Sequence, residues 1–153
     1  MKFPLRINYK ERFIPNVLIT VLGLRSIRPI LVAIDTGSDT TILSYKDANT
    51  LQIPVKDMST VKKIYGIGKD EVELCEYKKG LVFSLKDESN KTSRIKLDRI
   101  YISKDKEGAN ITIIGIDFLK DNNFSLYYNP NGQAYLEKDD LDKNIDQVKE
   151  KEK

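Results

Sequence analysis

Histidine and tryptophan are absent from this chain of 153 residues, and there is a single cysteine. Without histidine the chain cannot form a Ser-His-Asp triad, a Cys-His dyad or a histidine-ligated zinc site. The lone Cys75 cannot form an intrachain disulfide, and we expect it to be a buried packing residue. Any hydrolytic chemistry must therefore use carboxylates or lysines for proton transfer. We expect neither a metal ion nor another cofactor.

Long apolar runs and a strong charge of one sign are also missing. No segment approaches the roughly 20 apolar residues that a membrane-spanning helix needs, and Pro4 and Arg6 interrupt any apolar signal segment near the start. The formal charge is only +3, from 26 basic and 23 acidic residues, which is too small an excess to indicate a nucleic-acid partner. We therefore expect a cytoplasmic protein that binds neither nucleic acid nor a membrane.

Short β-strands dominate the periodic pattern of the sequence. Apolar and β-branched runs that predict strands cover residues 17–21, 30–34, 61–67, 72–77, 81–85, 95–102, 111–114, 124–128 and 134–136. The polar stretch 86–94 predicts a hairpin loop, and the sequence NPNG at 129–132 predicts a turn. Short helices are expected at Tyr45–Thr50, with Ser44 as the N-cap, and at 117–122. Many short strands with frequent turns predict an all-β barrel or sandwich.

One domain and a charged tail account for the whole chain. We expect the domain to cover residues 1–136 and the tail to cover 137–153, most of whose residues are charged. Leu141, Ile145 and Val148 are spaced by four and then three residues, which would suit one face of an amphipathic helix. A solvated charged tail fits the same composition equally well.

The candidate catalytic residue is Asp35, which follows the apolar run 30–34 directly. A carboxylate at the mouth of a buried strand is costly to desolvate unless hydrogen-bond donors surround it. Gly37 lets the backbone turn so that its N–H can reach the carboxylate, while Thr36 and Ser38 supply hydroxyl donors. Hydrogen bonds to the charged form stabilise that form. The same residue types also form ordinary turns, so this assignment needs support from other segments.

Two further segments supply that support. Residues 62–74 predict a β-hairpin with a glycine-rich tip at 66–68, which permits positive φ and the movement that a lid over a cleft requires. Residues 111–119 combine an apolar strand, Gly115 and the start of a short helix. Each segment by itself fits an ordinary hairpin or strand–helix turn, so the order of all three is what carries information.

Together the three segments resemble the retroviral-type (retropepsin-like) aspartic proteases over residues 15–136. In that family an apolar strand leads into Asp-Thr-Gly followed by alanine or serine, a glycine-rich flap follows, and two apolar residues and a glycine precede a short helix. The resemblance implies an all-β fold, a small closed β-barrel with one short C-terminal helix, assembled as a homodimer. The positions that match the family's site are the catalytic Asp35; the active-site loop residues Thr36, Gly37 and Ser38; the substrate-binding residues Asp39, Tyr65, Gly66, Ile67 and Gly68; and the supporting residues Ile114 and Gly115.

One position departs from the family pattern. Many retroviral members carry an arginine directly after the second motif's glycine, where it pairs with the acid at the position of Asp39. Here that position is Ile116, followed by Asp117. The carboxylate of Asp39 therefore needs another cation, such as Arg12, or this part of the dimer is built differently.

The chemistry implied by the resemblance requires two carboxyl groups. One carboxylate activates a water molecule as general base, while the other group, protonated, polarises the scissile carbonyl; two such groups in contact share a proton. Because the chain holds a single Asp-Thr-Gly, a symmetric homodimer would bring Asp35 of each subunit together on the two-fold axis. We expect an endopeptidase that binds an extended peptide or protein segment, with the Ser38 hydroxyl stabilising the ionised pair.

Two other functions fit the same residues less well. The first is a non-catalytic dimerisation or peptide-binding module that retains the fold, because a fold does not guarantee an activity. The second is a barrel that binds nucleic acid or oligosaccharide. That function requires clustered aromatic and basic residues, and the tyrosines of this sequence show no such clustering.

Overall fold

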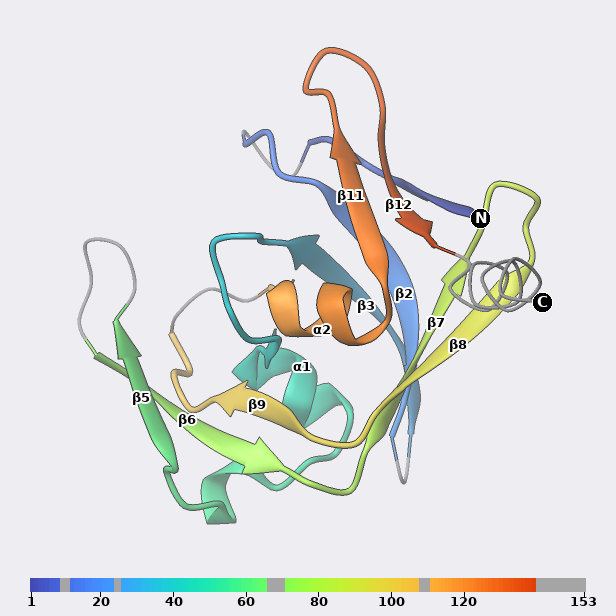
Figure 1. Ribbon diagram of the computed structural model, residues 1–153. Helices are drawn as coiled ribbons and strands as arrows, with labels where there is room; N and C mark the ends of the chain where they lie inside the picture. Colours follow the sequence, from blue (N-terminus) through green and yellow to red (C-terminus); the bar gives the residue numbers. More distant parts are fainter. Residues whose placement is uncertain (9–11, 24–25, 66–70, 108–110, 140–153) are drawn as a thin grey trace, which may run out of the picture.

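A computed structural model describes residues 1–8, 12–23, 26–65, 71–107 and 111–139 (Figure 1). The strands are β1 (Lys2–Leu5), β2 (Asn16–Leu22), β3 (Ile27–Ile34), β4 (Ile42–Leu43), β5 (Lys62–Tyr65), β6 (Glu71–Tyr77), β7 (Leu81–Lys86), β8 (Thr92–Leu97), β9 (Ile100–Ser103), β10 (Thr112–Ile114), β11 (Phe124–Tyr128) and β12 (Ala134–Lys138). The helices are α1 (Tyr45–Thr50), the 3-10 helix η1 (Val55–Asp57) and α2 (Ile116–Asp121). The predicted all-β class is confirmed, and the helices are few and short.

The strands form two open sheets rather than the closed barrel that we expected. The larger sheet has the order β5-β6-β9-β4-β10-β3-β2-β7-β8, and the smaller has the order β1-β12-β11. The larger sheet curves strongly, with β5 and β8 at its opposite ends (Figure 1). Within the described residues these two edge strands have no outer partner. Both carry exposed basic side chains, such as Lys63 and Lys96, and charged edges resist pairing with a further strand.

The apolar run 95–102 forms two strands instead of the single strand predicted for it. The buried isoleucine of β8, Ile95, has an odd residue number, whereas the buried isoleucines of β9, Ile100 and Ile102, have even numbers. The side-chain alternation therefore shifts by one residue between β8 and β9. This shift lets β8 pair with β7 while β9 pairs with β6 and β4.

Aromatic side chains join the two sheets through α2. The ring of Phe118 lies 5.9 Å from that of Phe83 on β7 and 5.8 Å from that of Phe124 on β11, between ring centroids. Phe124 in turn contacts Phe3 of β1 at 5.5 Å in an edge-to-face arrangement. Such pairs add about 0.5–1.5 kcal/mol each beyond the burial of their surface. They fix α2, and with it the strand–helix turn at Gly115, against the body of the domain.

Both predicted α-helices are present. α1 begins after Ser44, whose hydroxyl accepts a hydrogen bond from the backbone N–H of Asp47 at 3.1 Å, as expected for an N-cap. α2 spans Ile116–Asp121, one residue earlier than predicted. The described part of the chain has no helix that combines the length and the hydropathy needed to span a bilayer.

The last strand continues past the domain boundary that we predicted at Leu136. β12 includes Lys138, whose backbone N–H donates to the carbonyl of Met1 at 3.0 Å. The remainder of the predicted tail, residues 140–153 with Leu141, Ile145 and Val148, lies outside the described residues.

A tight turn between β7 and β8 contains a carboxylate that strengthens the fold at neutral pH. Asp87 Oδ1 accepts hydrogen bonds from the Ser89 hydroxyl at 2.8 Å and from the backbone N–H groups of Ser89 and Lys91, both at 2.9 Å. The Ser89 hydroxyl, followed by the Lys91 N–H, holds the pKa of Asp87 below its ordinary value of 3.8. The folded chain therefore favours the charged carboxylate more than the unfolded chain does.

Replacing this carboxylate should change the acid side of the stability profile. A depressed folded-state pKa gives a stabilisation that is complete above the unfolded value of 3.8 and is lost as the pH falls through the lower folded value. We expect Asp87→Ala to unfold at lower urea concentration than wild type at neutral pH, with the difference shrinking below pH 3.8. Ser89→Ala should show part of the same effect. A difference that is independent of pH would contradict this explanation.

Candidate active site

Asp35 lies directly after β3, at the end of a strand whose last residues are buried. Its backbone N–H donates to the carbonyl of Ile114, at the end of the parallel neighbour β10, at 2.9 Å. Its side chain is exposed in the single chain. The N–H of Gly37 donates to Asp35 Oδ1 at 2.9 Å, which is the backbone donor expected from the sequence. The carboxylate therefore projects from the body on a turn that already satisfies one of its oxygens.

The loop that carries Asp35 is fastened to the start of α2 by backbone hydrogen bonds. The N–H of Ile116 donates to the carbonyl of Ser38 at 2.8 Å, and the N–H of Asp117 donates to the carbonyl of Asp39 at 3.1 Å. In Figure 1 the loop between β3 and β4 runs beside α2. Two segments about 80 residues apart in sequence are thus joined at the site.

Gly115 lies so close to this loop that no side chain could occupy its position. A β-carbon placed there would lie 2.5 Å from the carbonyl oxygen of Thr40 and 2.7 Å from that of Ser38. Ile114, just before it, is fully buried in the core. Gly115 thus packs against the loop that carries Asp35, and Ile114 belongs to the core.

The remaining loop residues have contacts that the sequence did not specify. The hydroxyl of Ser38 donates to the carbonyl of Thr40 at 2.8 Å, so in the single chain it is directed to the backbone and not to the Asp35 carboxylate. Thr36 is exposed. Among the described residues, the carboxylate of Asp39 forms no ion pair, either with the exposed Arg12 or with another cation.

The segment predicted to form the flap contains strands β5 and β6, which pair antiparallel. Its strands pair from Lys62 opposite Leu74 to Tyr65 opposite Glu71. Tyr65 is 78% exposed at the end of β5. The predicted tip residues Gly66, Ile67 and Gly68 lie outside the described residues.

An apolar surface beside Asp35 was not identified from the sequence. In the sheet register, Ile113 of β10 lies between Ala33 of β3 and Ile42 of β4. Because successive side chains alternate between faces, these three residues share the face opposite Ile114 and Leu43. Ile42 and Ile113 are half-buried there, whereas Ala33 is only 4% exposed. Periodicity could not identify this surface, because residues 111–114 read ITII without apolar–polar alternation and β4 is only two residues long.

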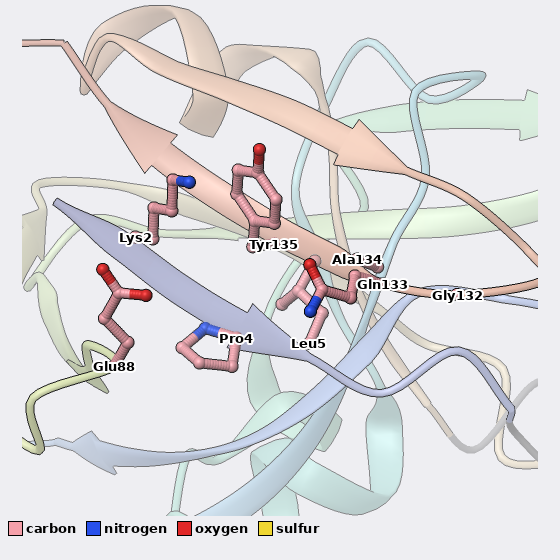
Figure 2. Close-up of a pocket in the computed structure, with 8 residues that line it drawn as sticks. All are labelled: Lys2, Pro4, Leu5, Glu88, Gly132, Gln133, Ala134 and Tyr135. Atoms are coloured by element: carbon pink, nitrogen blue, oxygen red, sulfur yellow. The ribbon is translucent and has the colours of Figure 1, made fainter.

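A separate pocket lies away from the Asp35 loop. It measures about 230 Å³ and lies between β1, the end of the turn before β12, and Glu88 (Figure 2). Lys2 and Tyr135 form part of its wall, with the Lys2 ammonium 4.8 Å from the centre of the tyrosine ring. No residue of the 35–41 loop lines it. Within the described ranges, no three cysteine or carboxylate side chains gather closely enough to hold a metal ion.

Similarity to known proteins was found among solved structures. No family model matches the chain, and no curated protein matches it significantly. A retropepsin-like aspartic protease from Rickettsia conorii superposes with a TM-score of 0.57 and 11% identity, covering 89% of this chain and 90% of that one. The EIAV protease bound to an inhibitor gives a TM-score of 0.49 at 23% identity, covering 80% of this chain and 100% of that one.

The retroviral protease-like domain of Ddi1 from Leishmania major gives a lower TM-score, 0.44, at 14% identity, covering 80% of this chain and 95% of that domain. The similarity to the Rickettsia structure spans nearly the whole of both chains. It agrees with the resemblance found in the order of the three sequence segments. The chain therefore has the fold of the retropepsin-like aspartic proteases.

Proposed function

We propose that this chain is an aspartic endopeptidase that acts as a homodimer, with Asp35 of each subunit forming the catalytic pair. The observation that carries the proposal is the placement of Asp35. It is exposed at the end of a buried strand, accepts a hydrogen bond from the Gly37 N–H, and belongs to a loop fastened to Ile116 and Asp117. Asp87 accepts a similar backbone hydrogen bond within its own turn, so the fastening of the loop to the start of α2 is what distinguishes Asp35.

The proposed mechanism follows from two carboxyl groups that share one proton. The ionised carboxylate takes a proton from a water molecule as that water attacks the peptide carbonyl, while the protonated partner donates its proton to the carbonyl oxygen. The tetrahedral intermediate then collapses as the first carboxyl group gives its proton to the leaving nitrogen, the C–N bond breaks, and the second carboxylate takes a proton from a hydroxyl of the intermediate. The pair thereby returns to its starting state. One exposed aspartate in a single chain cannot supply both groups, so the second must come from another copy.

The half-buried apolar side chains of Ile42 and Ile113 indicate the class of substrate. Ile113 is the cross-strand neighbour of Ile42 and of Ala33, which lies two positions before Asp35. We propose that the two isoleucines contact apolar side chains next to the scissile bond of an extended peptide. We also propose that the protein acts in the cytoplasm.

Truncating this surface should change specificity more than stability. Ile113→Ala is expected to lower kcat/KM for substrates with a bulky apolar residue beside the scissile bond by about tenfold or more, because a lost apolar contact costs discrimination of that size. Substrates with a small residue there should be affected less. Leu18→Ala, at an exposed position of β2, is the control and should cleave both substrates like wild type. An equal loss for both substrates in Ile113→Ala would argue against the assignment.

Cleavage of a mixed peptide pool, read by mass spectrometry from about pH 3 to pH 7, tests the proposed activity. We expect defined cleavage sites, and a rate per subunit that rises with protein concentration until the dimer is saturated. Sedimentation measured over the same concentrations should follow the same curve. A folded dimer that cleaves nothing would favour the non-catalytic peptide-binding module. A rate per subunit that is independent of concentration in a monomeric protein would contradict the shared site.

A further inference from the structure

Thr41 and Asp117 form a hydrogen-bonded pair beside the Asp35 loop, in which the threonine is buried and the aspartate half-buried. Thr41 is only 2% exposed, and its hydroxyl donates to Asp117 Oδ1 at 2.7 Å. The same hydroxyl oxygen accepts the backbone N–H of Gly115 at 3.1 Å. The Thr41 hydroxyl therefore links the end of the loop to both the glycine behind it and the first turn of α2.

The backbone of Asp117 continues this connection toward the catalytic residue. Its N–H donates to the carbonyl of Asp39 at 3.1 Å, next to the bond from Ile116 to Ser38 at 2.8 Å. The N–H of Ser38 in turn donates to the carbonyl of Asp35 at 3.2 Å. Asp117 thus holds the loop through its side chain at Thr41 and through its backbone at Asp39.

We propose that Thr41 and Asp117 are positioning residues for Asp35. Their hydrogen bond fixes the far end of the 35–41 loop, so its loss would let the loop shift away from Gly115 and would displace the Asp35 carboxylate. The inference rests on the proposed function for its catalytic consequence, because a misplacement of about 1 Å in a reacting group can lower a rate about 100-fold. Neither residue needs to contact the substrate.

The molecule contains a matched pair that serves as a control. Thr112 of β10 is fully buried, and its hydroxyl donates to Asp47 Oδ2 at 2.7 Å while accepting the N–H of Ser44 at 3.1 Å. This second pair has the same chemistry, the same distances and similar burial as the first. It joins β10 to the start of α1, and among the described residues its side chains form no hydrogen bond to the loop that carries Asp35. Thr112→Val should therefore cost stability without moving the loop.

Thr41→Val and Thr112→Val separate positioning from stability. Both variants replace a threonine hydroxyl by a methyl group, and we expect similar decreases in the urea midpoint. Thr41→Val should lower kcat about 10- to 100-fold with KM changed less than about twofold, whereas Thr112→Val should keep the wild-type kcat. Thr41→Ser, which restores the hydroxyl, should recover most of the lost kcat. Asp117→Asn, which keeps an acceptor oxygen, should retain more activity than Asp117→Ala.

Amide hydrogen exchange provides a readout that does not depend on cleavage. The N–H groups of Ile116 and Asp117 are bonded to the loop, so their exchange should accelerate about tenfold or more in Thr41→Val and little in Thr112→Val. Equal losses of kcat in the two variants, or exchange at Ile116 and Asp117 that is unchanged in Thr41→Val, would overturn the positioning role. If wild type cleaves no peptide, the proposed function fails, and the exchange comparison still decides whether the pair holds the loop.

Discussion

Asp35→Asn is expected to lower kcat/KM for peptide cleavage at least about 10³-fold while leaving the fold intact. An amide cannot act as the general base toward water, and it cannot share the proton on which the carboxyl pair depends. The side chain is exposed and accepts a hydrogen bond from the Gly37 N–H, which an amide oxygen can also accept. Peptide cleavage and urea unfolding, measured on the same preparations, would test both parts of the expectation.

A matched substitution and a mixing experiment make this result specific. Asp121→Asn changes an exposed aspartate on α2, away from the 35–41 loop, and should cleave like wild type.

When wild-type and Asp35→Asn subunits are mixed in equal amounts and allowed to exchange, about one quarter of the dimers should hold two intact aspartates. Activity should fall to that share, whereas independent monomeric sites would leave about half. Equal cleavage by Asp35→Asn and wild type would show that another residue, or another protein, carries the activity.

Gly115→Ala is expected to damage both stability and catalysis. Its methyl group would lie 2.5 Å from the carbonyl oxygen of Thr40 and 2.7 Å from that of Ser38, and backbone atoms cannot move aside as the end of a side chain can. Overpacking of this kind costs about 1–3 kcal/mol, occasionally more. Because the displaced backbone carries Asp35, kcat should fall about 100-fold even where the variant remains folded.

The glycine in the turn before β12 offers the control for this substitution. A β-carbon at Gly132 would meet the side chain of Asn129 at 3.4 Å, which is close to ordinary contact. Gly132→Ala should therefore change the urea midpoint and kcat little. Circular dichroism, urea unfolding and cleavage assays on both variants would test the comparison. A Gly115→Ala protein with wild-type stability and activity would show that the loop has another position available.

A structural feature could be predicted from local sequence where the residues that determine it lie in one short segment. The run of apolar residues before Asp35 predicted a buried strand because such residues are stable only out of water. Ser44 predicted the start of α1 because its hydroxyl can accept an N–H in the first turn, and the structure confirms that bond. Fold similarity to a solved retropepsin-like protease confirms the resemblance that the order of the three segments suggested.

Other features depended on partners that no local pattern reveals. The two-residue strand β4 is held by β10 and β9 on its two sides, and so short a segment has no periodicity of its own. The larger sheet is open, so the expected closed barrel was wrong. Closure could not be predicted from local sequence, because it depends on the pairing of strands far apart in the chain. The hydroxyl of Ser38 was expected near the Asp35 carboxylate, but it donates to the Thr40 carbonyl. The backbone conformation of the loop determines which acceptor the hydroxyl can reach.

The amino-acid sequence alone excludes histidine chemistry and an intrachain disulfide, predicts a fold of short strands, and indicates Asp35 as the candidate catalytic residue. These conclusions follow from residue type and spacing, which act over a few residues. The three-dimensional fold is needed to see that the Thr41 hydroxyl and Asp117 Oδ1 lie 2.7 Å apart across 76 positions and that Gly115 lies against the loop. Such contacts arise when strands β3, β4 and β10 pair side by side, and the free energy of that pairing is shared among residues distant in the chain.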